Sequence, residues 1–89
     1  MFRIWFKIFK DNKMLKDITY CDDRTDVNRT KKVYSGIDYA CYEFDLSKPI
    51  WLDNNIKQFK TFDKTRFYQD SFIESIDFDY LEVHVIEED

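Results

Sequence analysis

The stretch that decides the fold is "FRIWFKIFK", residues 2–10. Every second residue in its first part is apolar, namely Phe2, Ile4, Phe6 and Ile8. A period of two is typical of a β-strand, and Phe, Ile and Trp favour strands. Arg3, Lys7 and Lys10 also fall on one face of a helix, so a basic helix on a membrane surface is the alternative. We predict a strand.

The chain on either side supplies partners for this strand. Residues 11–13, "DNK", have the composition of a turn, and strand-like residues 14–21 follow them, which predicts a β-hairpin. Residues 78–87 alternate apolar with polar side chains, which predicts another strand. We expect this last strand to pair with residues 2–10, which would then be central in a small, mainly antiparallel sheet.

Two helices are predicted between the hairpin and the last strand. The first begins at Thr25 or Thr30, each a suitable N-cap, and ends near Phe44. Its apolar residues recur at spacings of three and four and form one stripe: Val33, Ile37, Ala40, Cys41 and Phe44. Gly36, the only glycine of the chain, lies inside this helix at a cost of about 1 kcal/mol relative to Ala. A glycine there indicates close packing against a neighbour.

The segment "FDLSKPIWLDNN", residues 44–55, is interpreted as a corner between the helices. Pro49 lacks a backbone N–H and cannot continue a helix. Asp53 is a suitable N-cap for a second helix over residues 54–62. We interpret Trp51 as a residue that holds this crossing to the core rather than as a binding residue.

The resulting order of elements is strand, strand, helix, helix, strand (ββααβ) within a single domain, residues 1–89. This order predicts a two-layer α+β fold, in which two or three helices pack on one face of the sheet. Residues 63–75 are the least regular part, and we expect a short extended piece there and a further helical turn at residues 69–75.

The composition excludes several kinds of site. One glycine cannot build a glycine-rich phosphate loop, and one His with two separated Cys has no metal-ligand spacing. We therefore predict no metal, no other cofactor and no small-molecule ligand. Cys21 and Cys41 are interpreted as reduced thiols of a cytoplasmic protein. We expect neither a signal peptide nor a membrane span, because no apolar run is long enough for either.

Charge is distributed unevenly along the chain, whose formal net charge is −4. Basic residues are concentrated in residues 1–16 and acidic residues in residues 70–89. The acidity disfavours nucleic-acid binding, which depends on neutralising phosphates with Lys and Arg. The acidic end suggests an alternative function, an inhibitor or decoy that imitates a phosphate backbone and acts on a nucleic-acid-handling enzyme. Its surface would consist of Asp70, Glu74, Asp77, Asp79, Glu87 and Glu88.

The sheet face turned away from the helices is predicted to be an interaction surface. Its side chains are apolar for a face in contact with solvent: Trp5, Phe9, Tyr80, His84 and Ile86. Arg3 and Lys7 are expected at its rim. Because aromatic residues and Arg are common anchors of interfaces, we predict a non-enzymatic module that self-associates as a homodimer or binds a protein partner. The alternative is that residues 63–75 fold over this face.

A small enzyme centred on His84 is a further alternative. A histidine that acts as a general base needs an orienting acid and a nucleophile nearby. Glu82 lies two residues away on the same strand face, whereas Cys41 belongs to the predicted apolar stripe and is expected to be inert. We therefore predict that the protein is not an enzyme.

Three phrases of the sequence resemble a known group of proteins. They are "RIWFKIFKDN" at residues 3–12, "FDLSKPIWLD" at residues 44–53 and "IDFDYLEVHVIEED" at residues 76–89. They are similar to segments of a group of short uncharacterised bacterial proteins of the Firmicutes type. The resemblance covers most of the chain and implies a bacterial, cytoplasmic, single-domain protein. The group has no assigned activity, so the resemblance implies no catalytic residue.

Overall fold

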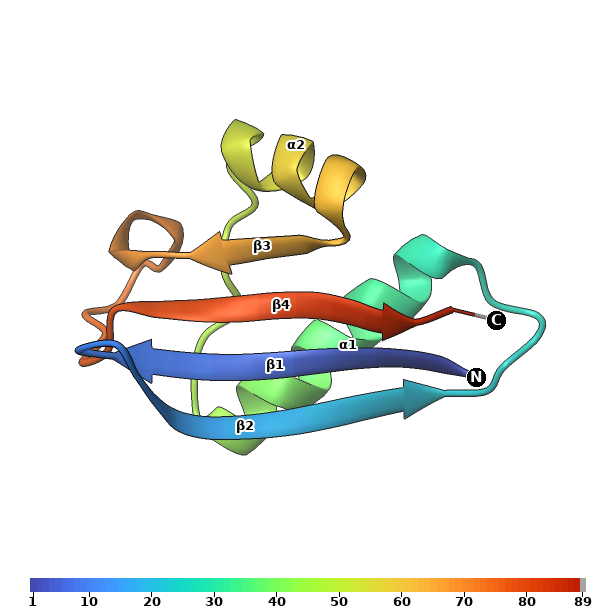
Figure 1. Ribbon diagram of the computed structural model, residues 1–89, viewed down its shortest axis with the longest axis horizontal. Helices are drawn as coiled ribbons and strands as arrows, with labels where there is room; N and C mark the ends of the chain where they lie inside the picture. The colour runs from blue at the N-terminus through green and yellow to red at the C-terminus, as the bar shows by residue number, and fades with distance from the viewer. Residues whose placement is uncertain (89) are drawn as a thin grey trace.

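The computed structural model describes residues 1–88 and has an α+β fold, as predicted. Its elements in chain order are β1 (Phe2–Lys10), β2 (Lys13–Asp22), α1 (Arg29–Phe44), α2 (Asp53–Phe62), β3 (Lys64–Phe67), the 3₁₀ helix η1 (Gln69–Ser71) and β4 (Tyr80–Glu87). The strands form one antiparallel sheet in the order β2-β1-β4-β3 (Figure 1). The predicted order ββααβ lacks β3, because four residues are too few to show a period.

β1 lies between β2 and β4, as predicted. Phe6 stands opposite Ile18 of β2 and Val83 of β4. The alternating side chains that face α1 are at most 4% exposed: Phe2, Ile4, Phe6 and Ile8. Burial of one alternating set, with the other set left on the opposite face, is the property of a strand and not of a helix lying on a membrane.

The turn between β1 and β2 is made by Asp11 and Asn12. Both residues have positive φ angles, 52° and 64°. Two successive positive φ angles are characteristic of the type I′ turn, whose twist matches the twist of a hairpin. Asp and Asn tolerate this region because their short polar side chains can hydrogen-bond locally. The predicted hairpin therefore forms without the glycine that is common at such turns.

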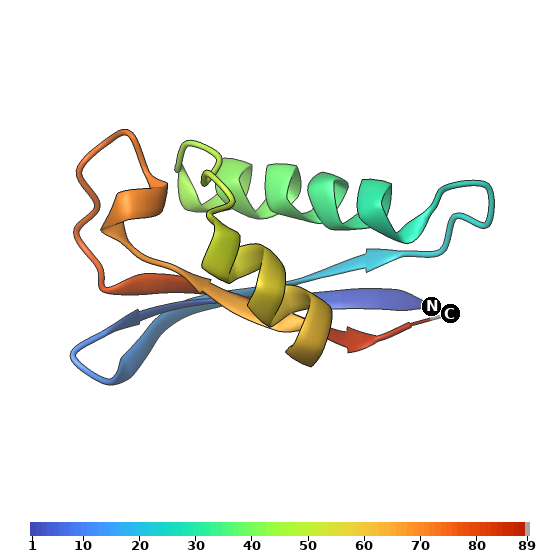
Figure 2. The same cartoon turned by 90° about the horizontal axis from the view of Figure 1, so that it is seen from above.

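α1 covers one face of the sheet (Figure 2). It begins after Asn28, whose Oδ1 accepts a hydrogen bond from the backbone N–H of Lys31 at 2.9 Å. The predicted N-caps, Thr25 and Thr30, are therefore wrong. Asp45 ends the helix in the left-handed region, with φ 56°.

Gly36 lies where α1 packs closely against the sheet. A Cβ atom at this position would lie 2.9 Å from Cδ2 of Tyr20, 3.0 Å from Cδ1 of Ile4 and 3.3 Å from Cζ of Phe6. Real Cβ contacts are longer than the first of these distances. The close packing predicted from the sequence is confirmed.

α2 lies beside β3 at the edge of the sheet (Figures 1 and 2), so the prediction that the helices pack on one face is correct only for α1. α2 begins at Asp53 with Leu52 as its N-cap, and the predicted N-cap, Asp53, is wrong by one residue. The Oδ1 atom of Asn55 accepts a hydrogen bond from the backbone N–H of Leu52 at 3.0 Å.

The crossing that leads into α2 is attached to the core by Trp51. Its indole meets the rings of Phe59 and Phe67 edge-on, with centroid distances of 5.3 and 5.0 Å. The backbone N–H of Ile50 donates to the carbonyl of Ser71 at 2.7 Å, which ties the crossing to η1. Trp51 therefore packs as its sequence position predicts.

Candidate interaction face

The face of the sheet opposite α1, called here the open face, carries no second layer in the part of the chain that the structure describes (Figure 2). Residues 63–75 do not fold over it. They extend the sheet as β3, which pairs with β4, and continue into η1. The predicted alternative, in which this segment covers the face, is therefore wrong.

The centre of the open face is a buried carboxylate held by two cations. Glu82 is 4% exposed, and its oxygens lie 2.7 Å from Nζ of Lys7 and 3.1 Å from Nε of Arg66. Lys7 was expected at the rim, but its Nζ lies here and also 3.9 Å from the centroid of Trp5. Burial alone would raise the pKa of Glu82, but the hydrogen bonds from Lys7 and Arg66 outweigh it and hold the pKa below its ordinary value.

One end of the face is an aromatic cluster. The ring of Phe9 stacks on that of Tyr80 with a centroid distance of 5.2 Å. The ring of Tyr68 also contacts Tyr80, with a centroid distance of 5.4 Å. The guanidinium of Arg66 lies 4.6 Å from the Tyr80 ring, a cation–π distance. Phe9 and Tyr80 are thus brought together as predicted, and they stand opposite each other on β1 and β4.

Trp5 and His84 stand opposite each other between this cluster and the far end. The indole Nε1 of Trp5 donates to Oδ2 of Asp17 on β2 at 2.9 Å. Burial lowers the pKa of His84 below its ordinary value, and the nearby charges of Lys64 and Lys7 lower it further. Among residues 1–88, His84 has no hydrogen bond to an acid or a thiol, which the enzyme alternative requires.

The far end of the face differs from the prediction because β4 carries a bulge. The register between β1 and β4 shifts next to Arg3, so Glu87 stands opposite Arg3 and Ile86 takes no place in the pairing. Arg3 Nε lies 2.9 Å from Oε1 of Glu87. Both side chains are close to half exposed. Ile86 is 46% exposed and is displaced from the regular alternation that predicted it on this face.

The two cysteines lie in different layers. Cys21 is exposed on β2, opposite Arg3, whereas Cys41 is buried in α1. Burial raises the pKa of the Cys41 thiol to about 11, with a smaller contribution from the charge of Asp38. Neither thiol lies within hydrogen-bonding distance of His84 in the described part of the chain.

Most of the predicted acidic surface is engaged within the molecule. Glu87 pairs with Arg3, and Glu88 pairs with Arg29 at 2.7 Å. The Glu74 carboxylate accepts from the backbone N–H of Ser47, and that of Asp79 accepts from the backbone N–H of Asp11. The remaining two predicted acids, Asp70 and Asp77, lie exposed in η1 and in the segment before β4, and Asp89 lies outside the described residues.

A recess of about 330 Å³ lies between α1 and α2. Its walls include Tyr34, Trp51, Ile56 and Phe59. Arg29 at its rim is already paired with Asp63 and Glu88, each at 2.7 Å. The recess is therefore an apolar depression. The charge of the Arg29 guanidinium at its rim is already neutralised by two carboxylates of the same chain.

The sequence did not identify several residues that build the open face: Asp17, Lys64, Arg66 and Tyr68. Arg66 and Tyr68 belong to the segment around β3, and the alternation of Thr65 and Phe67, both at most 2% exposed, is the one signal that could have placed Arg66 on this face. Asp17 offers no signal, because its role depends on the register between β1 and β2.

Comparison with protein-family models, with curated proteins and with solved structures gives no match. The bacterial resemblance therefore stays a prediction. Within residues 1–88, no helix has the length and apolar character needed to cross a membrane. The same residues contain no group of three or more His, Cys, Asp or Glu side chains arranged to hold a metal ion.

Proposed function

We propose that the protein is a binding module that takes up a protein partner on its open face. The observation that carries this proposal is an array of aromatic side chains and fixed charges, contributed by β1, β4 and β3, on a sheet face that no second layer covers. Rings held in place by neighbouring rings and charges lose little conformational freedom on binding, which favours affinity.

The charges around the face favour a partner with acidic groups. Lys64 and Arg66 project from β3 on this side, and Arg3 stands at the far end. Arg66 already pairs with Glu82 and Arg3 with Glu87, whereas Lys64 has no ion pair among the described residues. Burial lowers the pKa of His84, and the charges of Lys64 and Lys7 lower it further, against the opposite influence of Glu82 and Asp63. An acidic partner would neutralise the charge of Lys64, which favours a partner of that kind.

The two alternative functions have less support. An acidic decoy needs a negative surface that is not neutralised, but Glu87 and Glu88 pair with arginines. An enzyme centred on His84 needs an acid in reach, but the Glu82 carboxylate is held by Lys7 and Arg66. Each alternative therefore loses part of the set of groups that it requires.

The test uses the tagged full chain as bait in a lysate of the organism that encodes it, with retained proteins identified by mass spectrometry. Each candidate partner is then purified, and its direct binding is measured by calorimetry. We expect Lys64→Glu and Trp5→Ala each to raise the dissociation constant by at least about tenfold, because one reverses a charge at the contact and the other removes a central ring.

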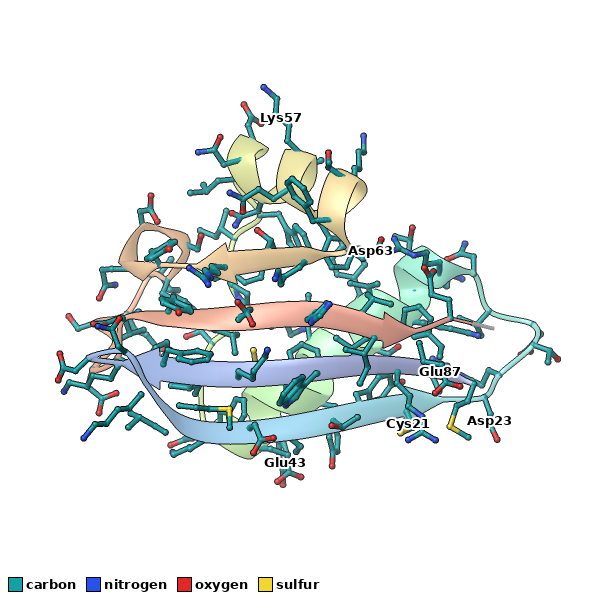
Figure 3. The ribbon with its side chains drawn as sticks, viewed as in Figure 1. Cys21, Asp23, Glu43, Lys57, Asp63 and Glu87 are labelled. Carbon is teal, nitrogen blue, oxygen red and sulfur yellow. The ribbon has the colours of Figure 1, made fainter. Side chains whose placement is uncertain are left out.

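The matched control is Lys57→Glu, the same charge reversal on the outer side of α2, away from the open face (Figure 3). It should leave the dissociation constant unchanged. Circular dichroism and thermal melting confirm that each variant is folded. Equal binding by the wild type, Lys64→Glu and Trp5→Ala would refute the proposal, as would a bait that retains no direct partner.

A further inference from the structure

The two edge strands of the sheet, β3 and β2, differ in whether another part of the chain covers them. At the β3 edge, α2 lies alongside the strand, and Nδ2 of Asn55 donates to the backbone carbonyl of Arg66 at 2.9 Å. Asn55 Nδ2 also donates to Oγ1 of Thr65, which in turn donates to Gln58 at 2.8 Å. A helix that occupies edge groups in this way prevents another strand from pairing there.

The β2 edge has no such cover within residues 1–88 (Figure 1). β2 is ten residues long, and most of its side chains are exposed. Its first part carries features that discourage pairing, namely Lys13, Lys16 and an irregular register at residues 14–16. Residues 17–22, "DITYCD", contain no Lys, no Pro and no register shift. The open part of the edge is therefore this second part.

We propose that residues 17–21 of β2 pair antiparallel with the same segment of a second copy, around a two-fold axis at Thr19. Opposed residues of an antiparallel pair share a face of the sheet, so a two-fold axis perpendicular to the sheet must pass through a residue. The axis at Thr19 sets Ile18 opposite Tyr20 of the second copy and Lys16 opposite its Asp22. The two four-stranded sheets then become one continuous sheet.

This register is self-complementary. Apolar Ile18 meets an aromatic ring and Thr19 meets Thr19, which are favourable cross-strand pairs. The Lys16 ammonium faces the position of Asp22, which is 4% exposed and whose carboxylate is already bound by Arg24 at 2.6 Å, so that pair contributes little. An axis at Tyr20 would set Asp17 opposite Asp23 and Ile18 opposite a carboxylate. An axis at Ile18 would set Lys16 opposite a tyrosine instead of an acid. The axis at Thr19 sets apolar Ile18 opposite Tyr20 and brings no two carboxylates together, so the occupant that fits this edge is a second copy rather than an unrelated strand.

The course of α1 is compatible with this pairing. The helix begins near the end of β4, where Arg29 binds Glu88, and reaches β2 in its second half, where Tyr39 packs 5.7 Å from Tyr20. Its last turn extends past the β2 edge, as the position of Glu43 shows (Figure 3). In the antiparallel pair, the end of α1 that extends past the β2 edge of one copy lies over the second copy. It lies over the half of the second copy's β2 edge that the second copy's own α1 does not cover. Both open faces lie on the same side of the joined sheet.

The first test measures the oligomeric state of the full chain by sedimentation velocity over a range of concentrations. The wild type is expected to form dimers. Thr19→Lys places two ammonium groups at the axis and should raise the dimer dissociation constant by at least about tenfold. Thr61→Lys, the same substitution at an exposed position of α2, should not change it. A wild type that stays monomeric throughout, or a Thr19→Lys variant that dimerises like the wild type, would overturn the proposal.

A second test checks the register. Thr19→Cys in a Cys21→Ser background places two thiols directly opposite each other, with Cβ atoms about 4.5–5.5 Å apart, close to disulfide geometry. Mild oxidation should give covalent dimers much faster than in the matched Thr61→Cys, Cys21→Ser variant. Equal rates would reject this register. Lys64→Glu, on β3 at the opposite edge of the sheet, should weaken binding by the open face but leave the dimer intact, so the two proposals succeed or fail separately.

Discussion

β1 contributes side chains to both the covered face and the open face of the sheet, and the two sets are stabilised in different ways. Under α1, β1 contributes Ile4 and Phe6, both fully buried in an apolar cluster. On the other side it contributes Trp5 and Lys7, which are held by a hydrogen bond, an ion pair and a cation–π contact. Burial of apolar area is large and insensitive to pH, whereas pairing of charges is smaller and depends on protonation. The difference indicates that the first face stabilises the fold by apolar burial and the second by contacts between charges and rings, and we propose recognition only for the second.

The largest expected effect tests the covered face. Phe6→Ala removes a ring that is 0% exposed and leaves a cavity between β1 and α1. We expect the free energy of unfolding to fall by about 3–5 kcal/mol, measured by urea denaturation. Phe62→Ala, at a phenylalanine that is 66% exposed, is the control and should have an effect below about 1 kcal/mol. Similar losses for the two variants would contradict the assignment of the core.

The next effect tests the open face. Glu82→Gln removes the charge between Lys7 and Arg66 and should lower the free energy of unfolding by about 1–3 kcal/mol at pH 7. Glu87→Gln on the same strand is the matched control. Its ion pair with Arg3 is close to half exposed, so the loss should stay below about 1 kcal/mol.

The same pair of variants gives a pH dependence. The pKa of Glu82 is lower in the folded protein than its ordinary value, so its contribution is present above the unfolded pKa, about 4.3, and disappears as the pH falls through the folded pKa. The difference in stability between the wild type and Glu82→Gln should therefore shrink as the pH is lowered from about 5 to about 3. A difference that stays constant would mean that Glu82 is stabilised by packing and not by charge.

A smaller effect is expected where the covered face is tightest. Gly36→Ala improves helix propensity by about 1 kcal/mol but inserts a methyl group against Tyr20 and Ile4, and overpacking costs about 1–3 kcal/mol. We expect a net loss of about 1 kcal/mol in urea denaturation. Ser35→Ala, one position earlier in α1, should not destabilise by a comparable amount. A Gly36→Ala variant more stable than the wild type would show that the interlayer contact is loose.

The mildest test compares the two thiols and needs no substitution. Cys21 is exposed on β2, whereas Cys41 is buried with a pKa raised to about 11. A thiol reagent at neutral pH should therefore modify one cysteine of the native protein and both after unfolding, as counted by mass spectrometry. Rapid modification of both in the native protein would show that α1 opens readily.

Sequence reasoning succeeded where a pattern is local and long. The alternation in residues 2–10 and 78–87 predicted the central strand and its neighbour, and the stripe through residues 33–44 predicted the helix that covers them. It failed where a pattern is short or interrupted. β3 is four residues long, and the bulge in β4 moved Glu87 into the place expected for Ile86. The N-cap of α1 was misplaced because Thr and Asn are both suitable caps and only Asn28 bonds to the first turn, and that of α2 was misplaced because Leu52 is not a preferred cap residue.

What the sequence determined by itself is which residues are apolar, in what period, and therefore which strands and helix form one core. The tertiary structure alone decided which charges meet. Lys7 became a central residue because β3 brought Arg66 to the other side of Glu82, and Glu87 and Glu88 of the acidic end were neutralised because β4 returned beside Arg3 and Arg29. Periodicity is a property of neighbouring residues, whereas ion pairs and edges depend on where distant segments of the chain come to lie.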